Sequence, residues 1–101
     1  MPDYRLTRRA LADLRDIARY TGETWGRRQA RLYVEELELR IRKLALSPEM
    51  GRLRDDVAPS VRSFPIGRHV MFYLTSESGI TVLRVLHPRM DVARAFRDNE
   101  S

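Results

Sequence analysis

The sequence predicts an α+β fold with the element order β-α-α-β-β-β. A helical hairpin packs on one face of a mainly antiparallel sheet, and a short C-terminal helical segment follows. Two observations predict this class. Apolar residues recur at three- and four-residue spacing between about 8 and 47, which is typical of two helices. Short segments rich in β-branched and aromatic residues, separated by turn residues, occupy about 61–87 and indicate strands joined by hairpins.

The N-terminal half begins with a weakly alternating segment, residues 3–6, which predicts a short strand. Thr7 then suits the N-cap of a first helix, and Gly26 suits the residue that ends it. A second helix is expected over about 27–46, because Ser47-Pro48 then stops it. The short break makes the two helices an antiparallel hairpin. The apolar stripes are Ala10, Leu11, Leu14, Ile17, Ala18 and Thr21, then Ala30, Tyr33, Val34, Leu37, Ile41 and Leu44.

The C-terminal half begins with a loop rich in Pro, Gly and Asp, over about 48–60. "PIGR" and "SESG" can each turn the chain between neighbouring strands. The tail has helical character over 91–97, with Asp91 as its N-cap. The three strands are expected at roughly 61–65, 69–75 and 80–87.

The length of 101 residues predicts one domain over 1–101, with the hairpin at about 8–47, the sheet at about 61–87 and the tail at 88–101. Hydrophobic residues make up 43% and charged residues 33%, which indicates a globular chain rather than a disordered one. The absence of cysteine excludes disulfides and thiolate metal sites. No apolar leader or membrane-length apolar segment is present, so we expect a soluble, cytoplasmic protein.

The chain is basic, with 19 Lys and Arg against 14 Asp and Glu, and every basic residue except Lys43 is arginine. Arginine favours phosphate or carboxylate, so the charge fits either nucleic acid or an acidic protein as partner. Alternatively, many of these charges pair along the helices at four-residue spacing. The four such pairs are Arg9–Asp13, Arg31–Glu35, Glu36–Arg40 and Glu38–Arg42. Charge alone does not decide the partner.

Strand alternation predicts which residues share a face of the sheet. The expected helix-facing set is Val70, Phe72, Leu74, Leu83 and Val85. The opposite set is His69, Met71, Tyr73, Val82, Arg84 and Leu86, with Arg62 and Phe64. An open face that mixes arginine with large apolar residues predicts a partner-binding surface. Two alternatives stay open: the C-terminal segment covers this face, or a one-residue slip exchanges the two faces.

The sequence has no Walker loop, GxGxxG, HExxH, EF-hand or nucleophile elbow, and two histidines without cysteine argue against structural zinc. We therefore expect no metal and no cofactor. One enzymatic option is metal-free RNA cleavage, with a histidine as acid or base and arginines on the phosphate. Its candidates are His69 and His87, Arg62, Arg68 and Arg84, and Tyr73 as a stacking or proton-donating group. In a simpler interpretation, His87 hydrogen-bonds exposed backbone where the last strand ends.

Five segments together resemble a known toxin family in their order and spacing. They are "YRLTRRALADLRDIARYT", "WGRRQARLYVEEL", "SPEMGR", "VRSFPIGRHVMFY" and "ITVLRVLHPRMD", and they cover nearly the whole chain. The sequence resembles the ParE branch of the RelE/ParE toxins of type II toxin–antitoxin systems. Each segment by itself is not specific to a family. The resemblance depends on all five segments occurring in this order and at this spacing.

The resemblance implies a RelE/ParE-like fold and a function without catalysis of its own. ParE toxins inhibit DNA gyrase by protein–protein binding and stall the cleaved DNA complex. A cognate ParD-like antitoxin with a ribbon-helix-helix domain neutralises the toxin by wrapping a C-terminal segment around it. The implied assembly is therefore a hetero-oligomer with the antitoxin that contacts DNA only through the antitoxin.

The RelE branch provides an alternative function, ribosome-dependent mRNA cleavage. Its members carry a basic cluster with terminal Tyr or His-Tyr residues. Here His87 is followed by Pro88, and the one lysine, Lys43, falls in the second helix, which weakens this reading. The alternative catalytic set is Arg62, Tyr73, Arg84 and His87. A third reading is a non-toxic, arginine-rich nucleic-acid binder.

The residues expected to contact antitoxin or target lie on the predicted open face and at the exit from the last strand. Arg84 has a second possible role as a structural pairing residue. The expected contact residues are Arg62, Phe64, Arg68, His69, Met71, Tyr73, Arg84, Leu86, His87, Arg89 and Met90.

Overall fold

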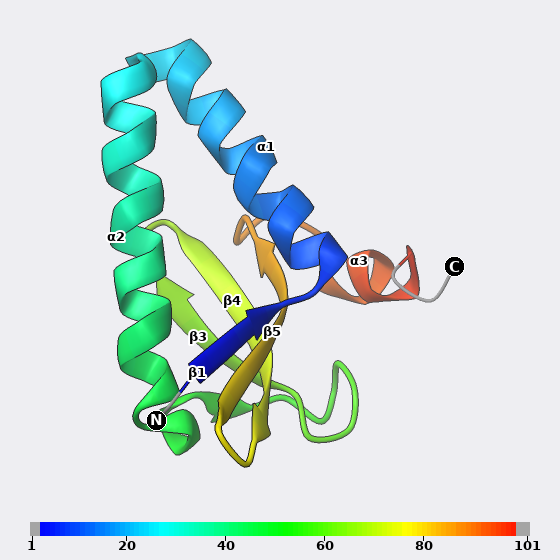
Figure 1. Ribbon diagram of the computed structural model, residues 1–101. Helices are drawn as coiled ribbons and strands as arrows, with labels where there is room; N and C mark the ends of the chain where they lie inside the picture. The colour runs from blue at the N-terminus through cyan, green and yellow to red at the C-terminus, as the bar shows by residue number, and fades with distance from the viewer. Residues whose placement is uncertain (1–2, 99–101) are drawn as a thin grey trace.

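The computed structural model describes residues 3–98, which form one five-stranded sheet with helices on both faces (Figure 1). The sheet order is β1-β5-β4-β3-β2; β1 is parallel to β5 and every other pair is antiparallel. This arrangement confirms the predicted α+β class. The strands are β1 (Asp3–Leu6), β2 (Arg52–Leu53), β3 (Arg62–Ile66), β4 (His69–Ser76) and β5 (Gly79–Leu86); the helices are α1 (Arg8–Trp25), α2 (Arg27–Ala45) and α3 (Val92–Asp98).

The helical hairpin begins and turns where the sequence predicts. The Thr7 hydroxyl accepts a hydrogen bond from the backbone N–H of Ala10 at 3.1 Å, which caps α1. The same hydroxyl donates to the carbonyl of Leu83 at 2.9 Å and so ties the start of α1 to β5. Gly26 joins the two helices with a φ of 94°, a backbone conformation that favours glycine. The predicted cap and turn are both confirmed.

The parallel pairing of β1 with β5 depends on close backbone approach at Gly79. The register runs from Asp3 opposite Gly79 to Leu6 opposite Val82. The backbone N–H of Asp3 donates to the carbonyl of Ser78 at 2.6 Å. A side chain at position 79 would collide with the backbone of Asp3, and the φ of Gly79 is 154°. Glycine at this position therefore allows β1 to lie against the sheet.

The other strands begin and end within one residue of their predicted bounds. The loop before them contains two elements that the sequence did not predict, a 3₁₀ turn at Pro48–Met50 and the two-residue strand β2. The tail helix is confirmed, since Asp91 accepts a hydrogen bond from the backbone N–H of Arg94 at 3.1 Å. Residues 99–101 of the predicted tail lie outside the described residues.

The main core fills the space between the helical hairpin and the sheet. This main core comprises Ala10, Leu14, Ile17, Leu37, Ile41, Leu44, Ala45, Ile66, Met71, Tyr73, Ile80, Val82 and Val85.

Within residues 3–98, no helix is long and apolar enough to cross a membrane.

Candidate interaction surfaces

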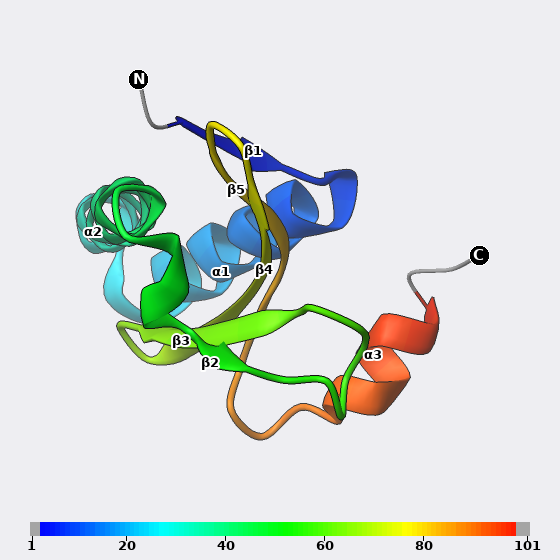
Figure 2. The same ribbon diagram turned by 90° about the horizontal axis from the view of Figure 1, so that it is seen from below.

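The sheet face turned away from the hairpin is covered in large part by the chain's own α3 and the loop before β3, which contradicts the prediction of an open binding surface. The short helix α3 lies on this side of the sheet, opposite α1 and α2 and next to the loop between β2 and β3 (Figure 2). Phe96 of α3 meets Phe72 of β4 edge to face, with ring centroids 5.4 Å apart. The loop before β3 adds the guanidinium of Arg54, 5.7 Å from the centre of the Phe72 ring. The second core on this face comprises Val61, Phe72, Leu86 and Ala95, with Val57, Ala58, Val70, Leu74, Leu83, Val92 and Phe96 packed against it.

The expected assignment of residues to the two faces is wrong for most of β4 and part of β5. On β4, Met71 and Tyr73 point to the hairpin, while Val70, Phe72 and Leu74 point to α3. On β5, a β-bulge places Leu83 between the pairs Tyr73–Val82 and Phe72–Arg84. Because the bulge adds one residue, alternation fails there: Val82 joins Val85 on the hairpin side, and Leu83 packs on the α3 side. Among the predicted contact residues, Met71, Tyr73, Arg84 and Leu86 are therefore buried.

Arg84 is a structural residue that joins α1, β5 and α3. Its guanidinium donates from Nε and Nη2 to the two carboxylate oxygens of Asp13, at 2.8 and 2.9 Å, and from Nη1 to the carbonyl of Ala95 at 2.9 Å. The side chains of Arg84 and Asp13 are only 8% and 12% exposed. Asp13 also accepts the backbone N–H of Val85. The pairing of β5 with β1 ends before this residue, at Val82. Asp13 thus pairs with Arg84, a partner that the four-residue helix spacing did not predict.

Tyr73 is enclosed in the main core with its hydroxyl fully engaged. The hydroxyl donates to the carbonyl of Pro48 at 2.6 Å and accepts the backbone N–H of Gly51 at 2.9 Å. Burial raises the pKa of Tyr73, so the phenol stays protonated at neutral pH. A Cβ at position 51 would overlap this hydroxyl, so glycine is needed there. Arg62 donates to the carbonyls of Glu49 and Gly51 and holds the same loop.

His69 and His87 lie together where β4 begins and β5 ends. Their ring centroids are 5.9 Å apart, and Nδ1 of His69 lies 2.8 Å from the hydroxyl of Tyr33. That hydroxyl accepts the backbone N–H of Arg68, so it is free to donate its proton to His69. Burial, followed by the nearby charge of His87, lowers the pKa of His69. His87 accepts the backbone N–H of Arg89 at Nδ1, which is the backbone-capping role considered from the sequence.

The four residues of the alternative nuclease reading do not meet at one surface. Tyr73 faces the hairpin in the main core, whereas Arg84 is buried between α1 and α3. Arg62 is held by loop carbonyls, and only His87 is exposed. Arg68, Arg89 and Met90 are exposed, Phe64 is partly buried against the main core, and within residues 3–98 no group of three potential metal ligands occurs.

An apolar groove, which the sequence analysis missed, lies between β1 and the two hairpin helices. Its volume is about 260 Å³. The buried Leu14 belongs to both its lining and the main core, and Leu11 is 41% exposed. The apolar stripe of α1 could have indicated this groove. It includes both Leu11 and Leu14, so it is wider than a stripe that packs against one surface alone. The lining residues are Tyr4, Leu6, Leu11, Leu14, Ala18 and Val34, with the charged Arg15 and Glu38.

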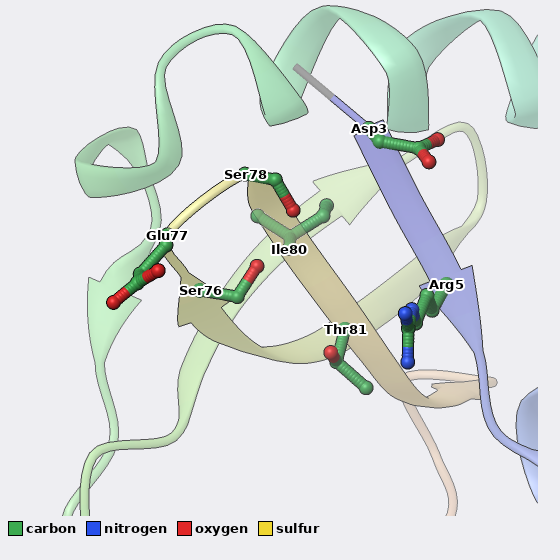
Figure 3. Close-up of a pocket in the computed structure, with 7 residues that line it drawn as sticks. All are labelled: Asp3, Arg5, Ser76, Glu77, Ser78, Ile80 and Thr81. Atoms are coloured by element: carbon green, nitrogen blue, oxygen red, sulfur yellow. The ribbon is translucent and has the colours of Figure 1, made fainter. Parts of the chain in front are cut away.

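A second hollow, of about 330 Å³, lies beside the turn between β4 and β5 and is polar (Figure 3). Figure 3 shows the side chains of Arg5 and Thr81 close together at one side and Glu77 turned outward at the other. Acidic, basic and hydroxyl groups are mixed here, so the hollow has no charge preference for a ligand. Its lining residues are Asp3, Arg5, Ser76, Glu77, Ser78, Ile80 and Thr81.

The comparison with protein families gives a match over residues 4–92, which is most of the chain. The matching family is described as "ParE toxin of type II toxin-antitoxin system, parDE".

Comparison with individual proteins agrees. The chain is 42% identical over 92 residues to a Toxin ParE1 of Mycobacterium tuberculosis, covering 90% of this chain and 94% of that protein. It is 41% identical over 95 residues to a Toxin ParE1 of Caulobacter vibrioides, covering 94% and 97% of the two chains. A solved structure titled "Chromosomal ParDE TA system from P. aeruginosa" superposes with a TM-score of 0.74 at 22% identity, over 86% of this chain and 96% of that one. This last similarity concerns the fold.

Proposed function

Because this chain belongs to the ParE toxin family of type II toxin–antitoxin systems, we propose that it inhibits DNA gyrase by protein–protein contact. The family match over residues 4–92 carries this proposal. The burial of Tyr73 and Arg84 supports a mechanism without RNA cleavage, because two of the four candidate nuclease residues cannot reach a substrate. The toxin then acts in the cytoplasm, where gyrase and its DNA lie.

We further propose that a cognate ParD-like antitoxin occupies the groove between β1 and the hairpin. The groove offers apolar side chains at its floor and one charge of each sign, Arg15 and Glu38, which suits an amphipathic helix. Next to it, β1 pairs with β5 on one edge, and among the described residues no strand pairs with its other edge. An extended antitoxin segment can add a strand there. DNA is then contacted only through the antitoxin's ribbon-helix-helix domain.

Purified toxin tests the first proposal in a reaction with gyrase, ATP and supercoiled plasmid. The expected result is linear DNA after protein denaturation, in an amount that rises with toxin and disappears when antitoxin is added first. Ribosome-bound mRNA incubated with the same toxin should stay intact. Codon-positioned cuts in that mRNA, with gyrase unaffected, would favour the RelE-type alternative.

The groove is tested by Leu11→Arg with Val34→Asp, which introduces charges where the antitoxin's apolar face would lie. Antitoxin affinity should fall by roughly 100-fold. Leu46→Arg is the matched control, because Leu46 is 64% exposed and does not line the groove. Equal antitoxin affinity for the groove variant and the control would place the antitoxin elsewhere.

A further inference from the structure

The junction of α1 and α2 projects beyond the sheet at the end of the hairpin, well away from α3 (Figure 1). Three large apolar side chains near this junction are exposed: Tyr20 at 68%, Trp25 at 64% and Leu32 at 47%. Three exposed arginines accompany them, Arg27, Arg28 and Arg31. We define these six residues as the hairpin tip. It shares no residue with the groove beside β1.

The composition of the hairpin tip is typical of a binding hot spot. Tryptophan, tyrosine and arginine are the residue types that most often dominate the energetics of protein–protein interfaces. An exposed tryptophan is a poor choice for a surface that meets only water, because its large apolar ring gains free energy when a partner covers it. The apolar share of the tip also favours a protein over the phosphate backbone of DNA, which binds mainly to charged and polar groups.

The arginines of the hairpin tip are available to a partner. Among residues 3–98, no carboxylate forms an ion pair with Arg27, Arg28 or Arg31. The predicted pair between Arg31 and Glu35 does not form. Glu23 is the one acidic residue between positions 19 and 32. The tip is therefore electropositive, which complements an acidic surface.

The charges of the hairpin tip are also unfavourable for the helices that carry them. Arg27 and Arg28 stand in the first turn of α2, where the helix dipole disfavours positive charge, and Gly26 supplies no side-chain cap. Residues that oppose local stability are commonly selected for function.

We propose that the hairpin tip is the surface by which this toxin holds gyrase, and that the gyrase surface it meets is acidic around an apolar centre. This inference rests on the proposed function and assigns it a location. Because the tip and the groove are separate, target binding and antitoxin binding are separable by substitution.

The test compares variants of the full-length toxin in the gyrase cleavage reaction and in direct binding to gyrase. Trp25→Ala should weaken gyrase binding by about 30-fold, and its matched control Leu46→Ala, at the same 64% exposure, should leave binding unchanged. The triple variant Arg27→Gln, Arg28→Gln and Arg31→Gln should weaken gyrase binding by roughly tenfold or more and reduce the salt dependence of that binding. The control for charge, Arg52→Gln with Arg94→Gln and Arg97→Gln, removes three exposed arginines elsewhere.

Antitoxin affinity separates a lost contact from a lost fold. Both tip variants should bind antitoxin as tightly as the wild type. If the tip variants poison gyrase as well as the wild type does, the hairpin tip is not the gyrase-binding surface, but the proposed function is retained. A wild-type toxin without effect on gyrase would overturn both. Tip variants that lose affinity for a short DNA duplex but keep their affinity for gyrase would identify DNA as the occupant and refute a protein partner.

Discussion

The two faces of the sheet are covered in different ways. On one face, two helices of 18 and 19 residues bury the main core. On the other, the seven-residue helix α3 packs on a second core with four buried residues. The main core is held by side-chain packing along the whole hairpin. The second core is held by apolar packing of α3 and the loop before β3 on the sheet, and by Arg84, which donates to the carbonyl of Ala95 in α3.

This difference indicates that stability is graded across the molecule. Elements with few buried apolar contacts open at lower free energy than the rest of a domain. We expect α3 to detach from the sheet while the hairpin and the main core stay folded. Its detachment would expose Phe72 and Leu86, which lie together in the second core. Strand alternation had assigned these two residues to different faces of the sheet.

The largest expected effect compares one residue of each core. Ile41→Ala should lower the free energy of unfolding by about 4 kcal/mol, because it leaves a cavity in a fully packed region. Phe96→Ala should lower it by about 2 kcal/mol, since Phe96 is only partly buried. Urea denaturation measures both values. Hydrogen exchange supplies the control: Phe96→Ala should speed exchange in α3 and leave α2 protected, and uniform acceleration would contradict a graded structure.

Asp13 is expected to have the next largest effect, because it holds Arg84, whose guanidinium donates to the carbonyl of Ala95 in α3. Asp13→Ala leaves the buried guanidinium of Arg84 and the N–H of Val85 without their acceptor, at a cost of about 3 kcal/mol. Replacing both partners, by Asp13→Leu with Arg84→Met, should restore most of the loss. Thermal unfolding of the two variants decides. A double variant as unstable as Asp13→Ala would mean that the geometry of the pair, and not the uncompensated charge, matters.

The smallest expected effect is a pH dependence that comes from His69. The pKa of His69 is lowered from its ordinary value of 6.5 in the folded state. At a pH below 6.5, the unfolded chain therefore binds a proton at His69 more readily than the folded chain does. The stabilising contribution of neutral His69 is therefore complete above that value, and it is lost as the pH falls through the lowered pKa. Denaturation of the wild type between pH 8 and 5 should show this decline, and His69→Gln should reduce it. An unchanged decline would assign it to carboxylates.

Most of the fold could be predicted because local signals decide it. Thr7, Gly26 and Asp91 mark helix ends through their own hydrogen-bonding or backbone preferences, and the strands lie between clear turn residues. The two-residue strand β2 carries no such signal. Its pairing depends on the loop that brings Arg52 opposite Ser63 and Leu53 opposite Arg62 of β3.

The assignment of site residues failed for a reason that no single strand contains. Both faces of β4 are apolar, so the alternation of Val70, Met71, Phe72 and Tyr73 does not say which face meets the hairpin. The bulge at Leu83 then changes the alternation along β5. Strand alternation placed Arg84 on the open face of the sheet, and its partner Asp13 lies 71 positions away. A sequence pattern cannot show that such a distant carboxylate will reach it.

Gly51 has a consequence for genetic selection. Survivors of toxin expression are a common source of inactive alleles, and the positions they reveal tend to be interpreted as contact sites. Any side chain at position 51 would displace the Tyr73 hydroxyl from its two backbone partners, although Gly51 belongs neither to the groove lining nor to the hairpin tip. Such survivors will include misfolded proteins at Gly51, so an allele reports on recognition only after its product has been shown to accumulate in folded form.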